Sequence, residues 1–302
     1  MNDLEKSEIE KEILKIIVFY DIFSFPLTIF EIKKLLTAFK NLGDLEDVLE
    51  ELIKTKLQRE NGFYFLRGRE ETVNSRNRRY NYSLRKIKIA QFFAKIFSKL
   101  PFVSALYLVN SIGIYNLRDE GDIDFFIITK AKRIWLSRFF CAGLMKILNK
   151  RPNSKTKKDK ICLSFYLSED NLNLKDLKIK EADPYFDFWE KNLLLLKDKK
   201  SLNQKFLRIN NLEAYYNFSR DKDRHKILEQ EKVAQGWRLM DYLEELAHSL
   251  QLKIMPRALL EAAETKDSSV GVVLSNNIIK LYLKDRRLEI KKKYEENLAK
   301  II

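Results

Sequence analysis

The 302-residue chain is poor in the residues that form disulfides and metal clusters. Its two cysteines, Cys141 and Cys162, lie in apolar segments, and its two histidines are His225 and His248. So few cysteines exclude a disulfide framework and are typical of a protein from the reducing cytoplasm. A zinc site built from cysteine and histidine is not expected either. Any metal ion should therefore be held by oxygen ligands.

Long apolar runs are missing as well. No stretch approaches the ~18 uncharged apolar residues of a membrane-spanning helix. The first residues, MNDLEKSEIEKE, lack the basic and apolar regions of a secretory signal. A hydrophobic content of 45% with 33% charged residues is ordinary for a globular protein. We therefore expect a soluble, cytoplasmic protein with no membrane partner.

Acidic residues are outnumbered by basic ones. The chain has 57 lysines and arginines against 43 aspartates and glutamates, which gives a formal net charge of +14. This excess favours a polyanionic partner such as a nucleotide or RNA, although a solvated lysine-rich surface is the alternative interpretation. The charge is concentrated in the ranges 67–99 and 150–160. In the second range the candidate polyanion-binding residues are Lys155, Lys157 and Lys158.

The N-terminal range 1–70 is predicted to form three short helices followed by a hairpin. Thr28 and Glu31 have the spacing of a capping box for the second helix. Asp44 is a candidate cap for the third helix, and the pair Asn61-Gly62 is a typical hairpin turn. This order of elements resembles a winged-helix module.

Such modules commonly read DNA with their third helix. Here the exposed face of that helix would carry four carboxylates, which the phosphates would repel: Glu46, Asp47, Glu50 and Glu51. Sequence-specific DNA binding is therefore not expected, and a packing or protein-contact role is favoured.

The range 71–182 is predicted to begin with a long basic helix and to continue as alternating strands and helices. In the helix, expected over 75–99, Phe92 would face inward while Arg76 and Lys86 would face outward. Three short β-branched and aromatic runs follow, with a helical run before the third, and this order is typical of an α/β layer.

The range 183–302 is predicted to be mainly helical, with a hairpin turning at Asn276-Asn277 near its end. The expected fold class is therefore α+β. The expected parts are the N-terminal module 1–70, a central α/β domain over 71–182, and a helical C-terminal domain over 183–302.

The most informative run is LYLVNSIGIYNLRDEGDIDFFIIT, residues 106–129. It ends one strand at Asn110-Ser111 and opens the next with Asp122 and Asp124. Residues i and i+2 of a strand point to the same face, so the two carboxylates should project together. Two such charges must be solvated, paired or bound to a metal ion, because burying them unpaired is too costly. Mg²⁺ prefers a few carboxylates together with water and phosphate oxygens, which this pair offers.

This run resembles the signature of the DNA polymerase β-like nucleotidyltransferase superfamily. That signature is a small-residue turn, a spacer of about ten residues and an acidic pair, matched here by Asn110-Ser111 and Asp122-Ile123-Asp124. The order of strands and helices also resembles a poorly characterised bacterial group of predicted nucleotidyltransferases with a winged-helix-like front.

The resemblance implies a function for each matched residue. Asn110 and Ser111 would bind the triphosphate of an NTP, and Asp122 and Asp124 would hold Mg²⁺ and act in catalysis. The reaction would move a nucleotidyl group from the NTP to an acceptor, which could be RNA, protein or a small molecule. The central domain would then be nucleotidyltransferase-like.

Two departures from the signature bear on this function. Asn110 stands where the superfamily usually has glycine, and its side chain would crowd a phosphate that approaches the backbone. Active members also place a third carboxylate on a later strand. The side chains that the next strand offers are not acidic: Cys162, Ser164 and Tyr166. The acids that flank this strand are Asp159, Glu169 and Asp170.

Three functions stay open at this point. The first is nucleotidyl transfer. The second is a catalytically inactive relative that binds nucleotide or nucleic acid through the same cleft. The third is a regulatory or interaction protein that acts through the winged-helix-like module.

Overall fold

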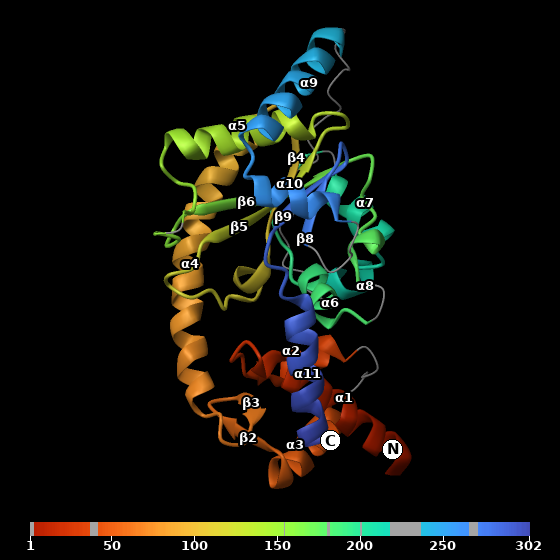
Figure 1. Ribbon diagram of the computed structural model, residues 1–302. Coiled ribbons are helices and arrows are strands. Elements are labelled where there is room, and N and C mark those ends of the chain that lie inside the picture. Colours follow the sequence, from red (N-terminus) through yellow and green to blue (C-terminus); the bar gives the residue numbers. More distant parts are fainter. Residues whose placement is uncertain are drawn as a thin grey trace. The chain divides into compact units, whose positions relative to one another are not determined.

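The fold is α+β in the computed structural model, as the sequence predicts (Figure 1). The structure describes residues 3–36, 42–153, 155–179, 182–199, 201–217, 237–265 and 271–302. The chain divides into two compact units, one of residues 1–81 with 288–302 and one of residues 82–287. Within the described ranges, no helix combines the length and the apolar character that crossing a bilayer requires.

The first unit contains three helices and a small antiparallel sheet with the strand order β1-β3-β2. The start of α4 and nearly all of α11 also belong to it. Its elements are α1 (Asp3–Asp21), β1 (Leu27–Thr28), α2 (Ile29–Leu35), α3 (Leu42–Thr55), β2 (Leu57–Glu60), β3 (Phe63–Leu66), α4 (Glu71–Phe97) and α11 (Arg287–Ile301).

Local sequence signals set two of these boundaries and fail at a third. The capping box is confirmed, because Thr28 accepts from the backbone of Glu31 and the Glu31 side chain accepts from the backbone of Thr28. The hairpin turn is also confirmed, with Asn61 and Gly62 at φ 50° and 80°. The prediction for Asp44 is wrong: α3 begins at Leu42, so Asp44 lies in the first turn instead of capping it.

The start of α4 differs from the prediction of an outward basic face. Arg76 is only 15% exposed and donates to both carboxylate oxygens of Glu31, at 2.9 and 2.7 Å. Its guanidinium also lies 4.0 Å from the ring centre of Phe25. The charge of Arg76 is thus paired with Glu31 and its guanidinium is stacked on Phe25, both within the first unit. Phe92, predicted to be inward, is 60% exposed.

The second unit is built on a six-stranded sheet with the order β7-β4-β5-β6-β9-β8. Only β5 and β6 run parallel, joined by α5, and every other neighbouring pair is antiparallel. The elements are β4 (Val103–Leu108), η1 (Asn110–Ile114), β5 (Ile123–Thr129), α5 (Ile134–Ile147), β6 (Ile161–Ser168), η2 (Lys175–Leu177), α6 (Pro184–Lys191), β7 (Leu194–Asp198), α7 (Leu202–Ile209), α8 (Glu213–Asn217), α9 (Trp237–Ile254), α10 (Arg257–Glu264), β8 (Gly271–Leu274) and β9 (Ile278–Tyr282).

Alternating residues of β5 separate two hydrophobic cores. Ile123, Phe125 and Ile127 pack with α4 and α5 on one face of the sheet. Phe126 and Ile128 pack with α6 and α7 on the other face. By the same period of two, Asp124 belongs to the face covered by α6.

The predicted ranges differ from this grouping. The range 183–302 is not a separate helical domain, because β7, β8 and β9 all join the central sheet and nearly all of α11 belongs to the first unit. The run 193–196 consists of four leucines, and such a run fits a buried strand as well as a helix. The hairpin expected around Asn276-Asn277 is confirmed as β8 and β9.

Candidate functional site

The predicted acidic pair lies where β4 ends and β5 begins. These strands are antiparallel neighbours, with Leu108 opposite Phe125, and the backbone N–H of Val109 donates to the carbonyl of Asp124 at 3.2 Å. The turn that follows β4 is therefore held beside the start of β5.

Asp122 and Asp124 lie side by side, as predicted. One carboxylate oxygen of each and the Sγ of Cys162 all lie within 4.8 Å of one another. All three residues are half-buried. Cys162 reaches them because β6 runs parallel to β5 and places it opposite Asp124.

Asn110 links the turn to the acidic pair. Its side-chain amide donates to Oδ2 of Asp124 at 2.9 Å, and its Oδ1 accepts from the hydroxyl of Tyr185 at 3.3 Å. The residue has φ 65°, which asparagine tolerates better than most residues. The same turn passes close to the end of α6: a Cβ on Gly113 would lie 1.9 Å from the carbonyl oxygen of Asn192. Glycine is therefore required there.

Ser111 follows Asn110 in η1 and is half-buried. Its carbonyl accepts from the backbone N–H of Asn116 at 2.8 Å, which closes the turn. The structure thus brings Asn110 to the acidic pair directly, and Ser111 adjoins it along the chain.

Burial and neighbouring charges shift the pKa values of Asp124 and of Cys162. Burial, together with the charge of Asp122, raises the pKa of Asp124 to about 7, although the hydrogen bond from Asn110 opposes this shift. Burial and the two carboxylates also raise the pKa of the Cys162 thiol well above its ordinary value. A positive charge between these groups would oppose both effects, because it favours the charged form of each ligand.

The site contains no third carboxylate among the residues that the structure describes. Cys162 and Ser164 occupy β6 where such an acid would have to stand, with their Sγ and Oγ 3.4 Å apart. The pairing shifts register here, since the three residues from Asp124 to Phe126 lie opposite the four residues from Cys162 to Phe165. Bulges of this kind are common beside functional sites because they redirect side chains.

The flanking acids do not supply the missing group. Asp159 accepts from Lys86 at 2.9 Å and from Arg85 at 3.1 Å. Glu169 accepts from Ser104 at 2.9 Å and lies beyond the opposite end of β5, about 16 Å from Asp124 along the strand. Asp170 is one residue further along the chain.

Lys86 has a role that its sequence position does not indicate. It was predicted to face outward, yet it is fully buried and donates to the carbonyl of Gly121 at 2.7 Å as well as to Asp159. Gly121 directly precedes Asp122, so this lysine fixes the backbone that leads into the acidic pair. An amphipathic pattern places a side chain on one face of a helix but cannot show that a loop will cover it.

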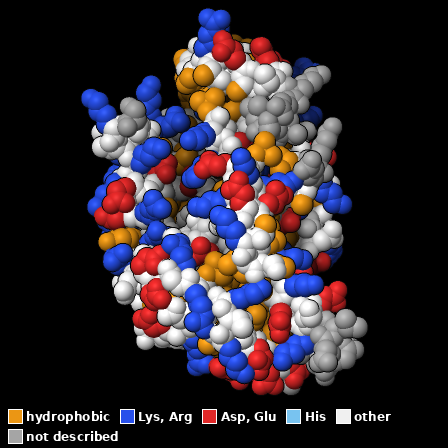
Figure 2. Space-filling view, turned by 60° about the horizontal axis from the view of Figure 1, so that its bottom comes forward, with side chains coloured by type: hydrophobic (Ala, Val, Ile, Leu, Met, Phe, Trp, Pro, Cys, Tyr) orange, Lys and Arg blue, Asp and Glu red, His pale blue; other side chains and the backbone are white. Residues whose placement is uncertain are grey.

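One of the three candidate residues of the basic loop, Lys157, acts electrostatically on the site. The positive charge of Lys157 partly opposes the rise in the pKa of Asp124, so the two side chains interact electrostatically. Lys158 instead pairs with Asp119 at 2.5 Å, and Lys155 is exposed. Figure 2 shows one face of the molecule, where lysine and arginine side chains are spread out with acidic residues among them. On that face the basic residues do not form a single patch.

Two tyrosines complete the surroundings of the pair. Tyr185 lies on α6 and Tyr282 at the end of β9, and the charge of Asp124 raises the pKa of both hydroxyls in addition to the effect of burial. Sequence reasoning missed them, because an aromatic residue far along the chain looks like an ordinary core residue until the sheet is closed.

The donor set decides which metal ions fit. Two carboxylates fit Mg²⁺, which takes a few carboxylates together with water and phosphate oxygens. The thiol of Cys162 is not a ligand for Mg²⁺, because soft sulfur donors select other metals.

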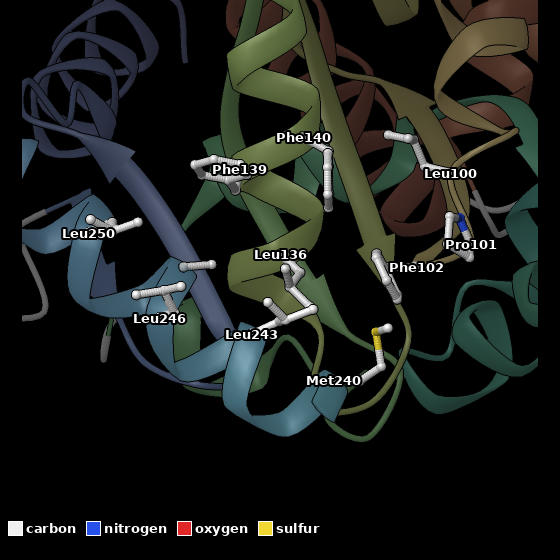
Figure 3. A pocket seen from close by; sticks show the side chains of 11 residues that line it. Leu100, Pro101, Phe102, Leu136, Phe139, Phe140, Met240, Leu243, Leu246 and Leu250 are labelled. Carbon is white, nitrogen blue, oxygen red and sulfur yellow. The ribbon is translucent and has the colours of Figure 1, made fainter. Parts of the chain in front are cut away.

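An apolar pocket of about 390 Å³ lies apart from this site (Figure 3). Its lining comes mainly from α5 and α9, including Phe139, Phe140, Leu246 and Leu250. Both helices pack on the sheet face opposite to Asp124, so the pocket is not a wall of the acidic site.

Comparisons with protein-family models, curated proteins and solved structures gave no match to this chain.

Proposed function

We propose that the second unit is a nucleotidyltransferase-like domain that binds a nucleoside triphosphate together with a divalent cation. Asp122 and Asp124 would hold the cation, and the turn at Asn110 and Ser111 would face the phosphates. The observation that carries the proposal is that the two carboxylates and this turn meet where β4 ends and β5 begins.

The cation would supply charge neutralisation for the triphosphate. The chain itself orients the site: Asn110 fixes one carboxylate, Tyr185 fixes Asn110, and Lys86 holds the backbone before Asp122. Lys157 adds positive charge at the rim, which raises the local concentration of phosphate groups.

Of the two functions that use this site, binding without transfer is favoured. Nucleotidyl transfer needs a base for the attacking hydroxyl, and the described residues offer no third acid beside the pair. Transfer to an acceptor, with Mg²⁺ as cofactor, is the second candidate, supported by the pair of carboxylates and by its resemblance to the superfamily signature.

Labelled nucleotides test the proposal. We expect saturable binding of a fluorescent NTP that requires a divalent cation and that is lost in both Asp122→Asn and Asp124→Asn. Asp170→Asn is the matched control, since Asp170 is an exposed acid at the far end of β6. Equal binding in all four proteins would refute the assignment. Chromatography of the nucleotide after incubation then distinguishes transfer, which releases pyrophosphate, from binding alone.

The first unit is proposed to be a winged-helix module with a protein-contact role. The order of its helices and the β1-β3-β2 sheet support this assignment. The carboxylates of Glu46, Asp47, Glu50 and Glu51 on α3 are exposed. Two of them form ion pairs: Glu50 with Arg59 at 3.1 Å and Glu51 with Lys54 at 2.9 Å. We expect a salt-sensitive, weak association with DNA at most, and a tight sequence-specific complex that persists at high salt would contradict this role.

A further inference from the structure

Cys162 makes the cation site different from the all-oxygen site that the sequence leads one to expect. We propose that Asp122, Asp124 and Cys162 form a three-ligand site that prefers Zn²⁺ to Mg²⁺. This inference concerns the cation of the proposed nucleotide site and rests on that function only for the role of the ion, since the three ligands could bind Zn²⁺ without a nucleotide.

The first argument is the geometry of the ligand atoms. The two carboxylate oxygens and Sγ lie within 4.8 Å of one another. Asp124 and Cys162 lie opposite each other on adjacent parallel strands, and Asp122 directly precedes β5. Each ligand needs to move by only about an ångström to reach the typical metal distances of about 2.0–2.3 Å. Strands hold such ligands more firmly than loops do.

The second argument is the chemistry of the donors. Zn²⁺ accepts both carboxylate oxygen and thiolate sulfur, whereas Mg²⁺ accepts oxygen donors and keeps its water. Three protein ligands also leave a fourth position open, which is the arrangement of zinc sites that bind substrate or water. A nucleotide phosphate oxygen is a ligand of the right kind for that position.

The third argument is an unused polar atom beside the ligands. The hydroxyl of Tyr282 is buried and makes no hydrogen bond that meets the usual geometric criteria within the described residues, although Ser164 lies close enough to lower its pKa. Tyr282 ends β9, which pairs with β6, the strand that carries Cys162 and Ser164. Buried hydroxyls are normally satisfied, so this polar atom is available to a group bound at the site.

The fourth argument is that one of the proposed ligands is held by hydrogen bonds from neighbouring side chains, as ligands of metal sites commonly are. The ligand Asp124 accepts a hydrogen bond from Asn110, and Asn110 is in turn held by Tyr185. Outer partners of this kind fix the direction of a ligand and strengthen metal binding.

Co²⁺ is the probe that tests this site in the full-length protein. Because thiolate ligation gives a sulfur-to-cobalt charge-transfer band in the near ultraviolet, we expect that band in the wild-type protein and its absence in Cys162→Ala. Cys141→Ala is the matched control, since Cys141 is the only other cysteine and is buried in the core. It should keep the band. Zn²⁺ should abolish the band at stoichiometric amounts, whereas a large excess of Mg²⁺ should not.

A second measurement protects the test against misfolding of a variant. In the Cys141→Ala background, Zn²⁺ should protect Cys162 from alkylation and Mg²⁺ should not. Cys162→Ala should lose at least about 100-fold in Zn²⁺ affinity, the upper end of what removal of a supporting residue costs. Its Mg²⁺ affinity should stay within about threefold of the wild-type value, because sulfur is not a Mg²⁺ ligand.

The inference is overturned if the wild-type protein shows no charge-transfer band, if Cys162→Ala keeps it, or if Mg²⁺ removes it as readily as Zn²⁺ does. These outcomes are separate from failure of the proposed function. Cation-dependent nucleotide binding without the band would leave the function standing and refute the zinc preference. The band without nucleotide binding would do the reverse.

Discussion

Asn110 donates a hydrogen bond of 2.9 Å from its side-chain amide to the carboxylate of Asp124. The residue that departs from the small-residue turn of the superfamily signature is therefore the one that orients the acidic pair. The bond favours the charged form of Asp124, whereas burial and Asp122 disfavour it. The Asn110 side chain, which would crowd a phosphate at the turn, thus fixes the orientation of the Asp124 carboxylate.

The first prediction concerns this bond. Asn110→Gly keeps a residue that adopts φ 65° without strain but removes the amide. Because the carboxylate then loses its orienting partner, we expect affinity for a divalent cation to fall about tenfold, the low end of the effect of outer partners. Isothermal titration calorimetry of the wild-type protein and Asn110→Gly with Zn²⁺ and with Mg²⁺ measures this affinity. If the affinity is unchanged while the fold is intact, the bond has no role in binding the ion.

The second prediction concerns the pH dependence of the metal-free protein. Asp124 has a pKa of about 7 in the folded protein against about 4 in an unfolded chain. Between these values the folded state holds a proton that the unfolded state has released, so this group lowers stability as pH rises through that window. Asp124→Asn lacks the titration and can still accept the bond from Asn110. Its stability relative to wild type should therefore increase between about pH 4 and 7, by on the order of a few kcal/mol, and stay constant above.

Urea unfolding in the presence of a chelator, repeated across this pH range, measures the difference. Asp170→Asn is the control and should show no such trend, because Asp170 is exposed. Parallel curves for wild type and Asp124→Asn would show that burial does not hold a proton on this carboxyl group.

The third prediction concerns Lys86. Lys86→Met removes a buried cation that donates to Gly121 and Asp159, and it leaves a carboxylate and a carbonyl without this partner. Breaking a buried pair in this way costs about 3 kcal/mol. Lys88→Met, an exposed position on the same helix, should cost less than about 0.5 kcal/mol. Equal unfolding midpoints for the two variants would contradict the anchoring role.

Physical rules of short range predicted much of the site. The period of two in a strand places Asp122 and Asp124 together, and the end of the preceding strand brings Asn110 to them. For β6 the same rule left two sets open, Cys162, Ser164 and Tyr166 or the residues between them; Cys162 and Ser164 lie at the site, whereas Tyr166 packs in the core on the other face. The rule could not show that Cys162 lies opposite Asp124, because the register of two parallel strands depends on the helix between them.

The long-range contacts of the site could not be predicted from the sequence, for a different reason. Tyr185 and Tyr282 reach the pair only because α6 covers that face of the sheet and β9 joins it beside β6. Lys86 is buried by a loop 35 residues further along the chain. The leucine run of β7 has no period that separates a strand from a helix. Each of these positions is determined by tertiary pairing, which local patterns do not encode.

The last prediction concerns the basic loop. The charge of Lys157 partly opposes the rise in the pKa of Asp124, whereas Lys158 pairs with Asp119, so the loop lies at the rim of the site. Each exposed cation contributes about 1 kcal/mol or less, and the effect of the loop must come from the sum. We therefore expect the variant with Lys155, Lys157 and Lys158 changed to Ala to bind nucleotide about tenfold more weakly at low salt.

Salt separates this effect from structural damage. The Debye length falls from about 30 Å at 0.01 M to about 3 Å at 1 M salt, so the affinities of wild type and variant should converge as salt is added. The matched control changes three exposed lysines elsewhere in the second unit to Ala: Lys146, Lys205 and Lys253. It alters the net charge by the same amount. If the control weakens binding as much as the loop variant does, the net charge of +14 acts through its sum rather than through the loop. If neither variant changes the affinity at low salt, the loop has no part in binding phosphate.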